Sequence, residues 1–311
     1  MATSRHCASP QKFLSKSNFP PKNFEQLRQL ALLIKQGHVD LAIGKKSLAA
    51  FVRMVQSPDT VATYNIVELS EKMALSPASI TRLAKLLGFH GYNAFQLVFK
   101  QKNKVANNFY SQSVAHLILD KKITNKTLFK QQLMQLNNDI EQCFSNEFLS
   151  LEKAKLLLAK KHRVFIFGYR QSSAVANILR YGLALIRPNV QMLVQADHGV
   201  AIALGQLKKD DLLVLISSAP YSNVTIKIAT MAKQQGCQIL SITDTALSPL
   251  NDLAEVALHI STDSNFYANS MVANCFFVEN LLSITAIELG DTAIYNLQQH
   301  EQLLADLEVS G

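Results

Sequence analysis

The stretch LSPASITRLAKLLGF, residues 75–89, combines small hydroxyl residues, bases and a glycine in a way that packing alone does not require. A serine before a helix accepts a hydrogen bond from a free amide, and proline at the first helical position loses nothing because that amide has no partner anyway. Ser76 and Pro77 therefore predict the start of a short helix, and Gly88 predicts its end.

This predicted helix has two distinct sides. The apolar side would be buried and consists of Ile80, Leu83, Ala84 and Leu87. Small residues near its start would let the helix enter the major groove of DNA, where recognition helices contact base edges with their N-terminal residues. Arg82 is suited to fork onto guanine or grip a phosphate, and Lys85 better suits a phosphate. The predicted DNA-binding residues are Ser76, Pro77, Ser79, Thr81, Arg82 and Lys85.

A second short helix, predicted over residues 66–73, precedes this one and completes a helix-turn-helix pattern. The pattern alone is equally typical of a helical bundle with a basic, solvated face. The charge distribution favours DNA. Residues 1–110 hold fifteen Lys/Arg against five Asp/Glu, whereas residues 111–311 hold sixteen against eighteen. The net charge of +8 therefore arises entirely in the first third, which suggests that this part faces a polyanion.

Two strand-to-helix loops in the second half of the chain are rich in hydroxyls. They are GYRQSSAVA, residues 168–176, and SSAPYSNVT, residues 217–225. Hydroxyls and free amides at helix N-termini suit an anion such as phosphate, and ligands of open α/β sheets sit beyond the carboxyl ends of the strands. The sequence contains neither GxGxxG nor GxxxxGK[ST], which disfavours dinucleotides and nucleoside triphosphates and predicts no cofactor.

The elements that would position these residues follow from hydrophobic periodicity. Helices are predicted over residues 24–36, 47–55, 66–73, 77–87, 109–160, 174–185, 224–235 and 272–282. Short apolar runs predict strands over residues 163–167, 190–194, 212–216, 238–242 and 256–260. Strands that alternate with helices indicate a parallel sheet covered on both faces. The predicted class is α + α/β, an all-helical helix-turn-helix domain followed by a doubly wound α/β domain.

A chain of 311 residues suits two domains. We predict a flexible tail, a helix-turn-helix domain, connecting helices with a possible dimer surface, a ligand-binding domain, and a C-terminal helix or tail. The corresponding ranges are 1–22, 23–105, 106–160, 161–295 and 296–311.

Composition excludes several classes of protein. With 48% hydrophobic and 17% charged residues the chain is globular. It has no secretory signal and no apolar run of the ~18 residues that a membrane span needs, so we predict a cytoplasmic protein without a membrane partner. The four cysteines form no CxxC pair, which predicts neither a metal site nor a disulfide framework.

Residues 67–96 resemble the DNA-binding segment of the RpiR/MurR-type bacterial transcriptional regulators, and the resemblance extends over roughly residues 24–290. The matching positions are Ser76, Ser79, Ile80, Arg82, Gly88-Phe89 and Gly91-Tyr92.

The two hydroxyl-rich loops resemble those of the SIS (sugar isomerase) fold, whose members bind phosphosugars. The resemblance implies ligand binding by Gly168, Ser172, Ser173, Ser217 or Ser218, Ser222 and Thr225. Arg170 and Tyr221, where the sequence departs from the family pattern, are further candidates for contact with the ligand. Arg170 stands where a second glycine is usual, so close backbone approach is lost there and a cation is gained. The ligand is then either phosphorylated or a carboxylate held by Arg170. The alternatives are a surface ion pair of Arg170 with Asp197 and simple helix capping by the serines.

The resemblance implies a regulator without enzymatic activity. A homodimer or homotetramer would present paired recognition helices to a double-stranded DNA operator, and a small anionic sugar-derived effector would modulate binding. The alternative is a SIS-type sugar-phosphate isomerase with a basic N-terminal extension. Its base would be Glu279, for which burial in an apolar helix would be needed; a structural or oligomer contact is the other interpretation. A basic scaffold for protein or RNA explains the charge but not the loops.

Four further polar residues have other predicted roles. We interpret His259, in a predicted strand, as structural and His198, near a strand end, as a turn residue. Tyr267 and Asn269 precede the last predicted helix and are candidates to close the ligand site.

Overall fold

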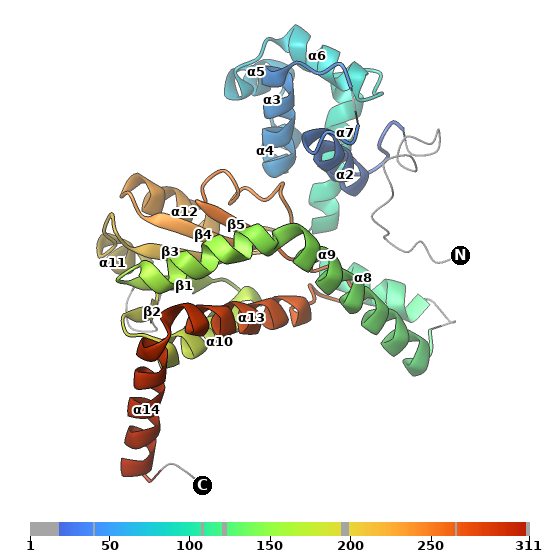
Figure 1. Ribbon diagram of the computed structural model, residues 1–311. Coiled ribbons are helices and arrows are strands. Elements are labelled where there is room, and N and C mark those ends of the chain that lie inside the picture. The colour runs from blue at the N-terminus through green and yellow to red at the C-terminus, as the bar shows by residue number, and fades with distance from the viewer. Residues whose placement is uncertain are drawn as a thin grey trace. The chain divides into compact units, whose positions relative to one another are not determined.

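The computed structural model describes residues 19–39, 41–106, 109–119, 123–193, 199–264 and 266–308. The chain divides between Gln112 and Ser113 into two compact units (Figure 1). The predicted class is confirmed, because the described part of the first unit is built of helices and the second contains a parallel sheet with helices. The finer boundaries predicted at residues 22, 105, 160 and 295 stay predictions.

Within the described residues the N-terminal unit is helical. Its elements are α2 (Phe24–Lys35), α3 (Lys45–Gln56), α4 (Pro58–Thr63), α5 (Ile66–Met73), α6 (Pro77–Leu86) and α7 (Tyr92–Ala106). The predicted helices correspond to α2, α3, α5 and α6. The helix α3 ends before Ser57, and Pro58 begins α4, because the fixed φ of proline suits the first helical position. The sequence did not predict α4 or α7.

Aromatic side chains form the centre of this unit. Phe51 of α3 and both Phe95 and Phe99 of α7 are fully buried. The ring of Phe95 lies 4.9 Å from that of Phe99 and 5.5 Å from that of Phe89, each in an edge-to-face arrangement. Such pairs contribute about 0.5–1.5 kcal/mol beyond their burial. Because α6 packs against α3 and α7, this cluster supports the helix that carries Arg82.

Two helices occupy the region predicted as helical over residues 109–160. They are α8 (Phe109–Leu119) and the 36-residue α9 (Asn125–Lys160). Thr124 caps α9 by accepting a hydrogen bond from the Thr127 amide, and the Thr127 hydroxyl accepts one from the Thr124 amide in return. The absence of Gly and Pro throughout α9 explains its length.

The C-terminal unit contains a five-stranded parallel sheet. The strands are β1 (Val164–Gly168), β2 (Val190–Met192), β3 (Leu212–Ile216), β4 (Gln238–Thr243) and β5 (Val256–His259). Their order is β2-β1-β3-β4-β5. All five were predicted, with the second ending earlier, at Met192, and Val194 lying outside the described residues. Every residue of β1 and β3 is buried, as expected for central strands covered on both faces.

Helices cover the two faces of this sheet (Figure 1). The face of Ile166 and Val214 packs with α9, α10 (Ser172–Ile186) and α13 (Val272–Leu289). The opposite face, with Phe165 and Leu213, packs with α11 (Val200–Gly205) and α12 (Asn223–Gln234). The last helix, α14 (Asp291–Asp306), lies in the region predicted at 296–311 as helix or tail, and it begins earlier than expected.

By length and mean hydropathy α13 is apolar enough to cross a membrane, which the sequence analysis did not expect of any segment. One such helix is weak evidence for a membrane span, since core helices of globular domains have the same composition. Ala273, Phe277, Val278 and Leu281 of α13 are buried in the core that it shares with α9 and α10. This packing makes one side of α13 part of the core of the unit.

Candidate functional sites

The turn between α5 and α6 is built by local hydrogen bonds. Ala74 ends α5 in the left-handed region with φ 54°, and its amide donates to carbonyl oxygens of the last turn of α5. The Ser76 hydroxyl accepts from the Ser79 amide at 3.1 Å, and Pro77 is the first residue of α6. Arg53 of α3 donates from Nη2 to the Met73 carbonyl at 2.9 Å, which fixes the end of α5. The predicted cap is therefore confirmed.

The two sides of α6 are those predicted. Ile80, Leu83, Ala84 and the following Leu87 are buried. Arg82 and Lys85 are exposed, as are Ser76 and Pro77, whereas Ser79 and Thr81 are half-buried. The Thr81 hydroxyl donates to the Pro77 carbonyl at 3.0 Å, and the Ser76 and Ser79 hydroxyls lie 2.9 Å apart. The hydroxyls of Ser76, Ser79 and Thr81 thus have partners at the start of the helix. The charged side chains of Arg82 and Lys85 extend into solvent.

Gly88 ends this helix in a conformation that favours glycine. Its φ is +86°, and a Cβ atom there would lie 2.7 Å from Cε1 of Phe19. The Gly88 amide donates to the Lys85 carbonyl and the Phe89 amide to that of Ala84. The glycine predicted as a stop signal therefore has both a backbone and a packing reason.

The two hydroxyl-rich loops leave the sheet side by side. β1 and β3 are neighbours, and Gly168 pairs in register with Ile216, the residue before Ser217. The helices that follow, α10 and α12, cover opposite faces of the sheet. In a sheet of order 2-1-3-4-5 this is the switch point, where the connections diverge and leave a crevice for ligands.

The first loop approaches its helix closely. A Cβ atom at Gly168 would lie 2.4 Å from the Ser172 carbonyl oxygen, so no other residue fits there. Arg170 is exposed and takes φ 55°, the left-handed conformation that a glycine in its place would adopt easily. Arg170 thus has the backbone conformation that a glycine would take at this position, and its side chain adds a guanidinium group to the loop. Ser172 is buried, and the Ser173 hydroxyl donates to the Arg170 carbonyl at 2.6 Å.

The second loop is held by the carboxylate that follows β4. The Tyr221 hydroxyl donates to Oδ1 of Asp244 at 2.5 Å, and the Ala219 amide lies 3.4 Å from Oδ2 of the same residue. Ser222 caps α12 by accepting from the Val224 amide at 3.3 Å, so the capping role considered for the serines holds for this one. Asp244 holds the loop that carries four of the predicted ligand-binding hydroxyls, Ser217, Ser218, Tyr221 and Ser222.

Thr225 is the most unusual residue of the second loop and its helix. It is 1% exposed, and its Oγ1 has no hydrogen-bond partner among the described residues. A buried polar atom without a partner costs about 1–3 kcal/mol, so it requires an explanation such as a ligand or a water molecule. Ser217 is also buried, whereas Ser218 is half-buried.

The remaining sequence candidates lie elsewhere. Glu279 is exposed on α13, which corrects the expectation that burial could make it a catalytic base. The ring of His259 lies between two polar partners, with Nδ1 2.7 Å from Glu147 Oε1 and Nε2 2.7 Å from Asn251 Oδ1, as suits a structural residue. Asp197 and His198 lie outside the described residues. Within the described ranges, no three His, Cys, Asp or Glu side chains gather as metal ligands would.

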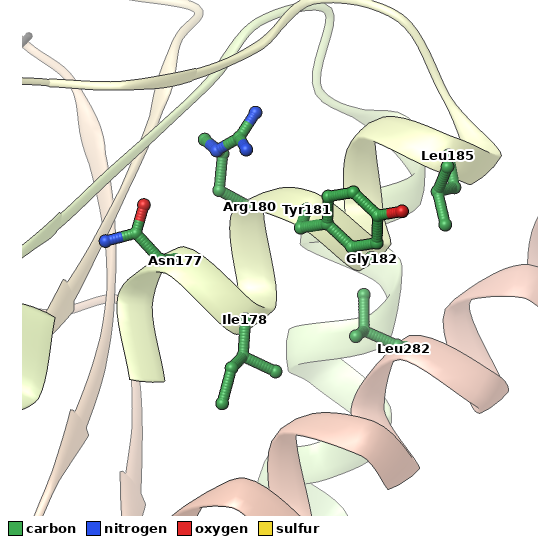
Figure 2. A pocket seen from close by; sticks show the side chains of 7 residues that line it. All are labelled: Asn177, Ile178, Arg180, Tyr181, Gly182, Leu185 and Leu282. Atoms are coloured by element: carbon green, nitrogen blue, oxygen red, sulfur yellow. The ribbon is translucent and has the colours of Figure 1, made fainter. Parts of the chain in front are cut away.

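An open pocket of about 530 Å³ lies away from the crevice, along α10 (Figure 2). Tyr181, Leu185 and, from α13, Leu282 line it together with Arg180. The two helices approach closely here, because a Cβ atom at Gly182 would lie 2.4 Å from Cδ1 of Leu282. The lining is mainly apolar and lacks the convergent hydroxyls of the loops, so the crevice is the better candidate for an anionic ligand.

Two protein-family models match the chain. The model described as helix-turn-helix domain, rpiR family, matches residues 29–105, and the SIS domain model matches residues 157–284. Together they cover most of the chain, in the order that the sequence analysis expected.

Two curated relatives each match about three quarters of the chain. An uncharacterized HTH-type transcriptional regulator of Clostridium perfringens is 23% identical over 74% of this chain and 81% of its own length. Another, of Haemophilus influenzae, is 22% identical over 73% of this chain and 78% of its own length.

Solved structures support the fold. The sugar isomerase domain of an RpiR transcription factor from Sphaerobacter thermophilus has a TM-score of 0.53 and 23% identity, and the match covers 56% of this chain and 98% of that one. The Vibrio vulnificus NanR protein, solved in complex with ManNAc-6P, has a TM-score of 0.51 and 17% identity, with 89% and 98% covered.

Proposed function

We propose, from the premise that this chain belongs to the RpiR family of helix-turn-helix proteins with a SIS domain, that it is a DNA-binding transcriptional regulator. Its SIS domain senses a phosphosugar or a related sugar acid and modulates operator binding. The observation that carries this proposal is the pairing of an exposed, cationic face on α6 with a ligand crevice between the loops after β1 and β3.

The DNA-binding role rests on α6. Its buried side fixes the helix on the core, and Arg82 and Lys85 extend from the other side into solvent. We infer that Arg82 contacts a base or phosphate and that Lys85 contacts a phosphate. The half-buried hydroxyls of Ser79 and Thr81 already bond within the helix, so they act mainly by allowing close approach to the groove.

The effector role rests on the crevice. The related NanR protein was solved with the phosphosugar ManNAc-6P, which supports an effector of this class here. We infer that amides at the N-termini of α10 and α12, the Thr225 hydroxyl and the Arg170 guanidinium bind the anionic group. The other proposed ligand residues are Gly168, Ser172, Ser173, Ser217, Ser218, Tyr221 and Ser222.

A homo-oligomer and a non-enzymatic role complete the proposal. Val272, Phe276 and Ile287 are exposed on α13, on the side of the helix that faces away from the core, and large exposed apolar side chains gathered on one side favour an interface with a second copy. A second copy that covers them would also bring a second α6 to the matching operator half-site. The isomerase alternative is not favoured, because the curated relatives are described as transcriptional regulators.

The experiment is a thermal-shift screen of sugar phosphates and sugar acids on the full chain, followed by operator binding with any compound that stabilises it. DNA selected from a random pool serves as operator. Binding should weaken with salt by a slope of about −0.9 per phosphate contacted. A protein that selects no DNA, or whose DNA binding ignores salt, contradicts the regulatory proposal.

Thr225→Val tests the effector site separately, with Thr230→Val as the matched control. Without ligand, Thr225→Val should leave the melting temperature unchanged or raise it, because it removes a buried hydroxyl without a partner. With the stabilising sugar phosphate, the shift should shrink. Thr230 lies on the same helix but donates to the Ile226 carbonyl at 2.9 Å, so its substitution should leave the ligand shift intact. Equal ligand shifts in both variants would remove Thr225 from the site.

A further inference from the structure

Asn269, in the connection between β5 and α13, is hydrogen-bonded to both hydroxyl-rich loops. Gln171 of the first loop donates from Nε2 to the Asn269 carbonyl at 2.8 Å. Asn269 itself donates from Nδ2 to the Ala219 carbonyl of the second loop at 2.7 Å. Asn269 therefore links the two loops that border the proposed ligand crevice.

In the second loop, both backbone polar groups of Ala219 have a side-chain partner. The Ala219 carbonyl accepts from Asn269, and the Ala219 amide faces the Asp244 carboxylate. Asp244 in turn accepts from the Tyr221 hydroxyl. The separation of the two loops is thus set by side chains rather than by the strands alone, and this separation decides whether one ligand can bind both loops.

The first residues of the same connection lie beside α9. His259, at the end of β5, contacts the buried Glu147 of α9 at 2.7 Å. Two residues further on, the Ser261 side chain lies near the carboxylate of Asp139, which is buried on the same helix, and lowers its pKa. α9 is the first helix that lies entirely beyond the division between the two units. The connection therefore contacts α9 at one end and both loops of the crevice at the other.

We propose that Asn269 is a positioning residue for the effector, and that the β5–α13 connection couples the crevice to α9. This deepens the proposed regulatory function and rests on it. An effector that bonds to both loops changes their separation, and because Asn269 bonds to both, the change is carried into the connection and on to α9. A ligand shifts such an equilibrium only through contacts that differ between the two states, and the loop separation supplies that difference.

Asn269→Asp is the sharpest test, since it keeps the shape of the side chain and removes the donor to Ala219. The backbone contact with Gln171 survives. Hydrogen exchange of the effector-free full chain should show residues 217–222 exchanging about two- to tenfold faster, the range expected for one lost hydrogen bond, with β3 and β4 unchanged. Gln234→Glu, at an exposed position at the end of α12, is the control for replacing an amide by a carboxylate. Asn269→Ala is a second variant without charge.

The functional arm measures affinity for pool-selected DNA with and without ManNAc-6P and a series of hexose 6-phosphates. Effector-free affinity should stay within about twofold of wild type, while the effector-dependent change should be reduced in both Asn269 variants and kept in Gln234→Glu. Unchanged loop exchange, or a full effector response in Asn269→Asp, overturns the proposal for Asn269. A wild-type protein that responds to no sugar phosphate overturns the effector part of the proposed function instead, and the coupling proposal with it.

Discussion

In the N-terminal unit the candidate site is one side of a single helix, whereas in the C-terminal unit it is a crevice held by contacts between distant segments. α6 receives its cap, its buried side and its exposed cations from residues 76–87. The crevice depends on hydrogen bonds that join residues 50 and 98 positions apart. A local site needs only a stable core beneath it, while a composite site needs each of its connections.

The largest effect is expected from a substitution that destabilises the core of the N-terminal unit only. Phe95→Ala removes a fully buried ring that contacts Phe89 and Phe99, and a change of this kind costs about 3–5 kcal/mol of unfolding free energy. We expect the N-terminal unit to unfold at lower urea concentration and DNA binding to be lost. Unfolding of the C-terminal unit and its ligand-induced thermal shift should stay as in wild type.

Circular dichroism and hydrogen exchange in urea would resolve the two transitions. Phe129→Ala, at a position 69% exposed on α9, is the control for loss of an aromatic side chain. If Phe95→Ala lowered the stability of both units equally, the comparison between an independent local site and an independent composite site would be wrong.

The next effect concerns α6 alone. Arg82→Ala should weaken operator binding by about 1–3 kcal/mol and, if the contact is to phosphate, reduce the salt slope by about one contact. Because Arg82 is exposed, thermal stability should not change. Fluorescence anisotropy at several salt concentrations measures both quantities, and Lys153→Ala, an exposed cation on α9, is the control. Operator affinity equal to wild type would remove Arg82 from the recognition surface.

The same contrast explains what the sequence could predict. The cap at Ser76, the buried residues of α6 and the stop at Gly88 are local signals, and all three were predicted. The strands were predicted because buried parallel strands are continuous apolar runs. Both loops were also identified, since hydroxyls follow β1 and β3 directly.

Relations between distant residues were not predictable from one sequence. Nothing near Asn269 indicates that it bonds to Ala219 and Gln171, and the contact of Tyr221 with Asp244 is equally non-local. The exposure of Glu279 was not predictable for a related reason. An apolar helix does not reveal which side faces the core, and the packing of α13 on α9 and α10 turns Glu279 outward.

A smaller effect is expected in the pH dependence of the stability of the C-terminal unit, through Asp139 of α9. Burial, with the nearby Asp263 carboxylate adding to it, raises the pKa of Asp139 to about 6, although hydrogen bonds from Gln135 and Ser261 act in the opposite direction. An unfolded aspartate titrates near ~3.9. Between about pH 4 and 6 the folded protein therefore binds more protons than the unfolded chain, and its stability falls as pH rises through this window.

Asp139→Asn should remove this dependence and raise the unfolding free energy of the C-terminal unit at pH 7 by about 1–2 kcal/mol. Urea unfolding at pH 4.5, 6 and 7.5 measures it. Asp210→Asn, at an exposed position, should keep the slope of wild type. A slope unchanged in Asp139→Asn would mean that another group near α9 is responsible.

The smallest effect distinguishes the two roles of Ser76, which caps α6 and is also proposed to face DNA. Ser76→Ala loses the hydrogen bond from the Ser79 amide and should cost about 1 kcal/mol of stability in the N-terminal unit. Ser76→Asp restores a capping oxygen and should recover that stability, yet it places a negative charge beside the DNA phosphates and should weaken operator binding. If Ser76→Asp recovered both stability and affinity, Ser76 would act only as a cap, and the DNA-facing side of α6 would begin after it.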